Sequence, residues 1–301
     1  MRLRHIEVFH AVMQAGTISG AAQVLHISQP AVTKVLQHCE LQLGLPLFER
    51  IRGKLYPRPE AHRLFAETEK LTRDLAGIRR LAATLKSKSV ETIRLVATPS
   101  LALSVLPPAL TQWRGGFPHT QCELSTQHTE AIVDSLRIGE ADLALSLQDP
   151  RHPNIVAEPL AEGALMAIAP PGTWPASARG KPLALADLPD ESIGLPGSDA
   201  LGELLAGALE AIDRPPVFRT VVQTYPIGRA LVESGGGVAV VDPFTAMLPH
   251  PERLDRRALS PTLPVRLYVL SASHQPLSHG ARELVERIAA VARRCVEPVA
   301  R

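Results

Sequence analysis

The chain has few of the residues that build disulfide-linked or metal-stabilised folds, with only three cysteines among its 301 residues. Cys39, Cys122 and Cys295 are far apart and odd in number, which argues against a disulfide framework and against the paired spacing of a zinc site. Because Cys39 falls on the apolar face of a helical pattern, we expect it to be a buried core residue. No bound metal is expected.

Long apolar runs are also missing, since no segment approaches the roughly 20 residues that a membrane-spanning helix needs. The amino terminus carries Arg2 and Arg4 and passes directly into a periodic pattern, without the apolar core of a secretory signal. Aromatic residues make up only 4% of the chain, and its 45% apolar and 21% charged residues are typical of a globular protein. These features predict a cytoplasmic protein with no membrane partner.

The sequence motifs of several enzyme classes are absent as well. Gly235-Gly236-Gly237 follows a helical pattern and precedes a strand, the reverse of the order in a dinucleotide-binding loop. The chain has no phosphate-binding Gly-x-x-x-x-Gly-Lys-Ser/Thr segment, no Gly-x-Ser-x-Gly turn and no His-Glu-x-x-His zinc motif. We therefore expect neither an enzymatic activity nor a cofactor.

Charge is distributed unevenly, although the whole chain carries only +2. Residues 1–88 contain 14 Lys and Arg against 7 Asp and Glu, a net charge of +7, whereas residues 89–301 carry −5. A basic first part joined to an acidic second part is typical of a polyanion-binding module attached to a sensor. A solvated charged surface is the alternative, so charge supports nucleic-acid binding without establishing it.

Three short helical patterns open the chain, over residues 3–15, over 20–25 and from Ser28 to Gly44, with a tight turn at 26–28. That order is typical of a helix-turn-helix, whose third helix enters the DNA major groove. An apolar stripe on the third helix faces the core and leaves a polar face outward. The expected DNA-contacting residues on that face are Ser28, Gln29, Pro30, Thr33, Lys34 and Gln37.

The chemistry of this polar face suits base edges. Gln29 is able to pair with adenine in two places, Thr33 offers a hydroxyl and a methyl to thymine, and Lys34 reaches guanine or a phosphate. An ordinary solvent-exposed helix face is the alternative for Gln29 and Thr33 taken alone. The preceding helix and turn favour DNA reading.

Two short strands follow, at residues 47–50 and 55–57, around a basic turn. This hairpin is expected to act as a wing that brings three cations to the minor groove or to phosphates: Arg50, Arg52 and Lys54.

Pro59 opens a long helix that runs to about Lys86. Its apolar positions alternate spacings of four and three, and this 3.5-residue period favours pairing of two such helices across a dimer. Packing of the helix on the core of its own protein is the alternative.

From residue 89 the pattern changes to strands alternating with helices, which predicts two α/β lobes with mostly parallel sheets and a cleft between them. In open α/β sheets, ligands lie beyond the carboxyl ends of strands and near helix N-termini. The residues expected there are Thr98, Pro99, Ser100, Gln127, His128, Gly197, Ser198, Asp199, Thr224 and Tyr225. For each of them a helix cap or polar turn without a ligand is the alternative.

Two kinds of ligand group fit these positions. Hydroxyls and backbone amides at residues 98–100 and 197–199 suit a carboxylate. Asp242, which follows a predicted strand at 238–241, suits the ammonium group of an amino acid, and a strand-end turn without a ligand is the alternative.

Residues 1–70 resemble the winged helix-turn-helix of LysR-type transcriptional regulators, through Ser28-Gln29-Pro30 and Leu47-Phe48-Glu49-Arg50. The order of the second part is similar to the effector domain of that family, which has a periplasmic-binding-protein fold. The resemblance implies an α/β protein with a winged helix-turn-helix domain (1–58), a linker and dimerisation helix (59–88) and a two-lobed effector-binding domain (89–301). The first lobe is expected at 89–161 and 267–301, and the second at 162–266.

The resemblance also implies function and partners. It predicts a transcriptional regulator, either an activator or a repressor, that binds double-stranded promoter DNA, RNA polymerase, a small-molecule effector and further copies of itself, as a homodimer or homotetramer. Segments 3–7 and 48–55 are most similar to the branch that controls lysine biosynthesis from diaminopimelate. We therefore expect diaminopimelate, lysine or a related amino acid as effector. A solute-binding protein of transport type, without DNA function, is the alternative.

Overall fold

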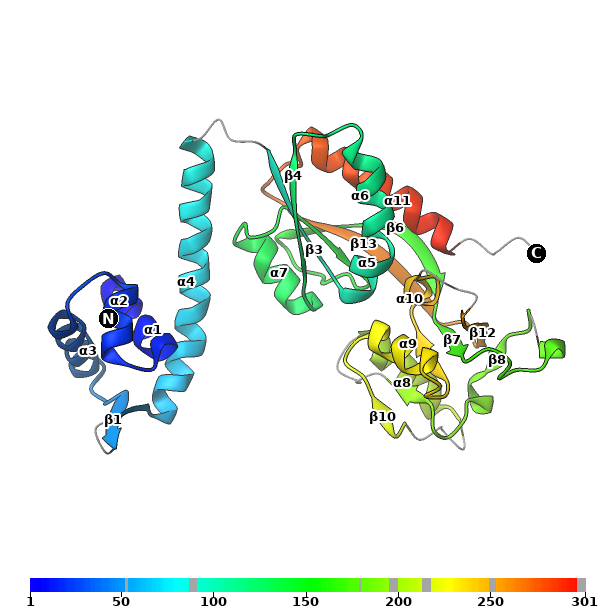
Figure 1. The fold of residues 1–301 in the computed structure, drawn as a ribbon, viewed down its shortest axis with the longest axis horizontal. Coiled ribbons are helices and arrows are strands. Elements are labelled where there is room, and N and C mark those ends of the chain that lie inside the picture. Colours follow the sequence, from blue (N-terminus) through cyan, green and yellow to red (C-terminus); the bar gives the residue numbers. More distant parts are fainter. Residues whose placement is uncertain are drawn as a thin grey trace. The chain divides into compact units, whose positions relative to one another are not determined.

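The chain folds into two compact units, Met1–Lys88 and Ser89–Arg301, each described by itself below. A computed structural model (Figure 1) describes residues 1–51, 54–86, 91–178, 180–194, 200–212, 218–248 and 253–296. Within these ranges no helix is long and apolar enough to cross a membrane.

The first unit begins with three helices packed around one apolar core. The helices are α1 (Leu3–Ala15), α2 (Ile18–Val24) and α3 (Gln29–Leu43). Phe9, Val32 and Leu36 lie in the shared core, which also contains the buried Cys39, as expected. Gly16 and Gly44 end α1 and α3 in the left-handed conformation, at φ 66° and 72°, where an L-residue with a side chain would be strained.

A small hairpin and a long helix complete this unit. Strands β1 (Phe48–Ile51) and β2 (Lys54–Pro57) pair antiparallel, and helix α4 (Pro59–Lys86) follows. A carboxylate oxygen of Glu40 on α3 accepts hydrogen bonds from the backbone amides of Leu47 and Phe48, at 2.7 and 3.1 Å. These bonds hold the hairpin against α3.

The start of α4 packs on its own unit. The ring of Phe65 stacks on His10 of α1 with centroids 4.8 Å apart, and Thr68 is buried. Leu71, one turn further along the predicted seam, is 38% exposed. The seam beyond Leu75 lies outside the described side chains, so pairing of two α4 helices stays a prediction.

The second unit contains two sheets. The five-stranded sheet has the order β4-β3-β5-β13-β6 and the six-stranded sheet the order β10-β9-β11-β7-β12-β8. The strands of the first are β3 (Thr92–Ala97), β4 (Gln121–Thr126), β5 (Leu143–Ser146), β6 (Ile155–Ala164) and β13 (Pro264–Ala272). Those of the second are β7 (Met166–Ala169), β8 (Leu183–Ala184), β9 (Ile193–Gly194), β10 (Thr220–Val221), β11 (Ala239–Val241) and β12 (Asp255–Ser260).

Helices pack against both sheets (Figure 1). Those that follow strands of the five-stranded sheet are α5 (Pro99–Ser104), α6 (Leu106–Arg114), α7 (Thr129–Arg137) and α11 (His279–Val296). Those of the six-stranded sheet are α8 (Ala200–Glu210), α9 (Tyr225–Glu233) and α10 (Pro243–Ala246). The buried indole of Trp113 on α6 donates to the carbonyl of Gly280, at 2.9 Å, and so fastens α6 to α11.

The sheets are less parallel than the sequence pattern predicted. Strand β3 is parallel to β4 and β5, whereas β13 is antiparallel to both β5 and β6, and β7 is antiparallel to β11 and β12. Strands β6 and β12 were not predicted from the sequence. In β6 the reason is that Pro159 and Gly163 are typical of a loop. Proline is tolerated there since β6 lies at the edge of its sheet.

The chain passes between the two sheets twice. The first passage is at Leu165, between β6 and β7, and the second at residues 261–263, between β12 and β13. The amide of Leu165 donates to the carbonyl of Leu263, at 2.9 Å, so the two passages lie side by side. Both passages lie within the second lobe expected at 162–266, a few residues from its two ends.

A buried histidine in the first unit makes its stability depend on pH. His5 is 7% exposed, its Nδ1 accepts from the amide of Arg2, and its Nε2 lies 3.2 Å from Nδ1 of His38. Burial lowers the pKa of His5 below its usual 6.5, and the positive potential of His38 lowers it further. The unfolded chain therefore takes up a proton below about pH 6.5 that the folded unit resists, so acidification destabilises the fold.

We expect His5→Asn to weaken this pH dependence. The melting temperature of the wild type should fall between about pH 7.5 and about pH 5.5, and the fall should be smaller in the variant. Part of it should remain, because burial also lowers the pKa of His10. Calorimetry at both pH values measures the change, and His119→Asn, at an exposed position of the second unit, is the control. An unchanged fall in His5→Asn would contradict the assignment.

Candidate functional sites

The polar face of α3 lies open to solvent. Five of the six residues predicted to contact DNA are exposed: Ser28, Gln29, Pro30, Lys34 and Gln37. The sixth, Thr33, is half-buried, and its hydroxyl donates to the carbonyl of Gln29 at 3.1 Å, which leaves its oxygen lone pairs and its methyl group for a ligand. Val32, Leu36 and Cys39 are buried on the opposite side of the helix. Helix α3 therefore has the two-sided character that groove insertion requires.

The first turn of α3 adds backbone donors to this surface. Ser28 is the N-cap in an extended conformation, but its hydroxyl makes no cap hydrogen bond. The amides of the first helical turn have no partner inside the helix, and such amides bind phosphate oxygens. Arg50 on β1 is exposed and adds a cation. Arg52 and the side chain of Lys54 lie outside the described residues, so their roles stay predictions.

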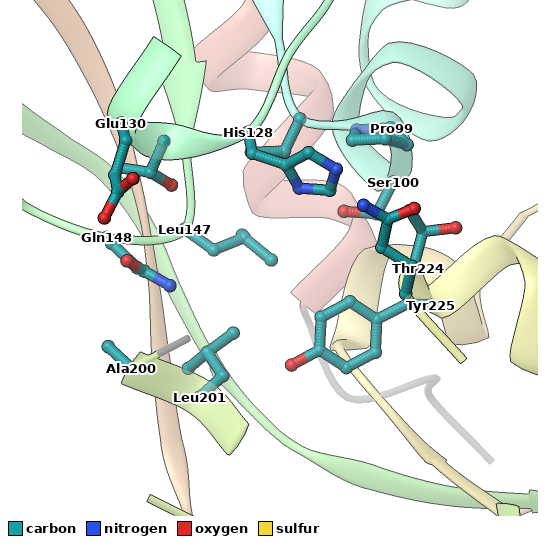
Figure 2. Close-up of a pocket in the computed structure, with 13 residues that line it drawn as sticks. Pro99, Ser100, His128, Glu130, Leu147, Gln148, Ala200, Leu201, Thr224 and Tyr225 are labelled. Atoms are coloured by element: carbon teal, nitrogen blue, oxygen red, sulfur yellow. The ribbon is translucent and has the colours of Figure 1, made fainter. Parts of the chain in front are cut away.

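A pocket of about 350 Å³ lies in the second unit where helices of both sheets begin (Figure 2). Six residues expected from the sequence line it: Thr98, Pro99, Ser100, His128, Thr224 and Tyr225. They follow the ends of β3, β4 and β10 and begin α5, α7 and α9. Gly197, Ser198 and Asp199 lie outside the described residues. The strand-end rule therefore predicted six residues that the structure brings together in one pocket, and their contact with a ligand stays a prediction.

Three helix starts in the pocket are left without side-chain caps. Thr98, His128 and Thr224 are the N-caps of α5, α7 and α9, all with extended backbone, and none accepts a cap hydrogen bond from the first turn. In addition, the buried Oγ1 of Thr98 has no hydrogen-bond partner within the described part of the chain. Uncapped amides and an unsatisfied hydroxyl favour a negatively charged or hydrogen-bonding group of a ligand at this end of the pocket.

The other end of the pocket is acidic. Figure 2 shows Glu130 and Gln148 together on one side, while Ser100 and Thr224 lie on the opposite side. Leu147 and Leu201 contribute apolar surface. The pocket therefore offers a seat for an anion, a seat for a cation and apolar surface.

Two predicted ligand residues serve the scaffold instead. Asp242 is fully buried and does not line the pocket; its carboxylate caps α10, accepting from the amides of Phe244 and Thr245 and from the Thr245 hydroxyl, at 2.9, 3.0 and 2.6 Å. The assignment of Asp242 to an ammonium group is therefore corrected to the strand-end alternative. Gln127 accepts a 2.9 Å hydrogen bond from Ser135 and braces α7 outside the pocket lining.

Asp242 nevertheless interacts with one residue of the pocket lining, Ser100. Burial raises the pKa of this carboxyl above its usual value, although hydrogen bonds from Thr245, from the Phe244 amide and from Ser100 act in the opposite direction. Since Ser100 lines the pocket, Asp242 lies directly behind the wall and positions it.

Several residues that line the pocket were not predicted from the sequence, chiefly Glu130, Gln148 and Leu201. Gln148 follows β5, so applying the strand-end rule to this third strand would have found it. Glu130 lies in the first turn of α7, where an acidic residue reads simply as a partner of the helix dipole. Leu201 has no polar signal at all.

Comparison with known proteins matches both units. Residues 3–62 match the family model "Bacterial regulatory helix-turn-helix protein, lysR family", and residues 86–293 match the "LysR substrate binding domain". The chain is 35% identical to the transcriptional regulator DgcR of Pseudoalteromonas sp. over 93% of this chain and 96% of that protein. It is 30% identical to the transcriptional activator LysR of Escherichia coli over 92% and 89%.

The fold agrees with a solved full-length regulator. The structure of CbnR in complex with its target DNA matches with a TM-score of 0.66 and 21% identity, over 98% of this chain and 100% of that one.

Substitution of Gln29 tests base reading by α3. In Gln29→Ala, we expect binding to the preferred duplex, selected from a random library, to weaken by about 1–3 kcal/mol, because a two-point contact with a base is lost. Binding to unrelated duplexes should change little. Fluorescence anisotropy with both duplexes measures the difference, and Gln112→Ala, at an exposed position on α6, is the control. Equal losses on both duplexes would refute base reading at this position.

Proposed function

Because the chain belongs to the LysR family of bacterial transcriptional regulators, we propose that it binds promoter DNA through α3 and the β1–β2 hairpin under the control of a pocket ligand. The exposed polar face of α3, opposite its buried apolar face, carries the DNA part of the proposal. The family is one of regulators rather than enzymes. The helix-turn-helix match also removes the support for a transport protein without DNA function.

The parts of the chain divide the work. In this proposal residues 1–58 read DNA, residues 59–88 pair two chains, and residues 89–301 bind the effector. Two paired first units place their α3 helices in successive major grooves, as in other dimeric helix-turn-helix proteins. The regulator then works in the cytoplasm, where promoter DNA and RNA polymerase are, as a homodimer or homotetramer.

The effector is a zwitterionic amino acid in this proposal, such as lysine or diaminopimelate. Its carboxylate binds the uncapped starts of α5 and α9, with the hydroxyls of Thr98, Ser100 and Thr224 nearby. The ammonium group at the far end of its side chain binds Glu130, with Gln148 beside it. The separation of an anion seat from a cation seat in one pocket is the observation that supports an amino acid over a simple acid.

A comparison of matched ligands tests the effector class. We expect L-lysine or meso-diaminopimelate to raise the melting temperature of the full chain more in the wild type than in Glu130→Gln, and hexanoate at the same concentration to have the same effect on both. Glu130→Gln should weaken amino-acid binding about tenfold or more, because a charge-assisted hydrogen bond is lost. Glu158→Gln, at an exposed position on β6, is the control.

The outcomes separate the two parts of the proposal. Stabilisation by simple acids alone, with no effect of Glu130→Gln, would reject the amino-acid effector and leave the DNA function standing. Failure to select any preferred duplex from a random library, with or without ligand, would reject the DNA function.

A further inference from the structure

A second cavity of about 430 Å³ lies in the same unit, and none of its described lining residues lines the pocket above. It borders the first passage between the sheets, together with α10, β12 and the end of α11. Much of its lining is apolar: Leu165, Met166, Pro243, Met247, Leu254 and Val296.

One cation faces this apolar cavity. Arg256 on β12 is half-buried, and its guanidinium donates to the sulfur of Met247, a weak acceptor. Within the described residues no carboxylate lies within ion-pairing distance of Arg256. By contrast, Arg229 and Arg266 in the same unit each bind a carboxylate, Glu233 at 2.8 Å and Glu162 at 2.7 Å. A half-buried guanidinium without an anion lacks the compensation that buried charges normally have.

The neighbouring carboxylate does not supply that compensation. Asp255 also borders the cavity, but its Oδ2 accepts from the amide of Gly172 at 2.8 Å. Successive side chains of a strand point to opposite faces, so the side chains of Asp255 and Arg256 diverge, while Ala258 lies on the same face as Arg256. Burial lowers the pKa of Arg256, and the positive charge of Arg229 lowers it further. Both effects favour an anion in the cavity.

We infer that this cavity is a second ligand site, for a small carboxylate with an apolar tail. The carboxylate pairs with the guanidinium of Arg256, and the tail lies against Met166, Met247 and Leu254. Among the described lining residues Arg256 is the one cation and Asp255 the one acid, and Asp255 already accepts from the amide of Gly172, so these residues favour a carboxylate over the ammonium group of an amino acid. The two sites therefore select different chemical classes.

Titration of the full chain with hexanoate tests the inference. We expect saturable binding by isothermal titration calorimetry, weakened about tenfold or more in Arg256→Gln because a charge-assisted bond is lost. Arg266→Gln removes an equal charge outside the cavity, and its affinity should stay within about twofold of the wild type.

Two further variants locate the site. Ala258→Phe fills the cavity from an exposed position while leaving Arg256 in place, and should also weaken hexanoate binding about tenfold or more. Thr98→Val alters the main pocket and should leave hexanoate binding unchanged. No saturable binding, or binding that Thr98→Val weakens while Arg256→Gln and Ala258→Phe do not, would overturn the inference. Circular dichroism of each variant checks that it is folded.

Discussion

Strands β6 and β13 pair antiparallel from one end to the other, joining Ile155 to Ala272 and Ala164 to Pro264. The two passages between the sheets leave from the same end of this pair, and the bond from Leu165 to Leu263 holds them together. Every helix start in the main pocket takes its position from one sheet or the other. The position of Thr224 relative to Thr98 and Ser100 therefore depends on this doubled passage, because the chain runs from one sheet to the other there.

Helix starts are used in both units for the same physical reason. The first amides of a helix have no partner within it, and the aligned peptide dipoles leave positive potential there. In the first unit the start of α3 lies exposed beside Gln29 and Lys34, which suits a phosphate-lined groove. In the second unit, the starts of α5 and α9 line a pocket of the size of a small metabolite. In the proposed function, one backbone property thus serves recognition of both a polymer and a small molecule.

Local signals in the sequence were enough to predict the limits of most helices in the first unit. Gly16, Gly44 and Pro59 mark helix ends and starts whose conformation depends on the residue itself, and α1, α3 and α4 have the expected limits. Strand β3 also has the expected limits, because its apolar residues are buried within the sheet. In each of these cases the residues that determine the element lie within it or beside it.

Prediction failed where distant residues decide the structure. Strand β6 depends on pairing with β13, about a hundred positions later, and its own Pro159 and Gly163 disfavour it. Asp242 carries the same strand-end signal as a ligand residue, and only its full burial reveals a cap. That Glu130 lines the pocket likewise could not be predicted, because it depends on α7 and α8 lying at the same cavity. Ligand contacts at residues 197–199 stay predictions.

The short helix α10 packs against α5, which begins at one cavity, and forms part of the wall of the other. Its cap, Asp242, lies behind Ser100 of one cavity, while Pro243 and Met247 form part of the wall of the other. An occupant of either cavity that displaced this four-residue helix would therefore displace residues of both walls. Thermodynamic reciprocity then requires that each occupant alter the affinity for the other by the same factor. Such a protein would compare two metabolites rather than report one.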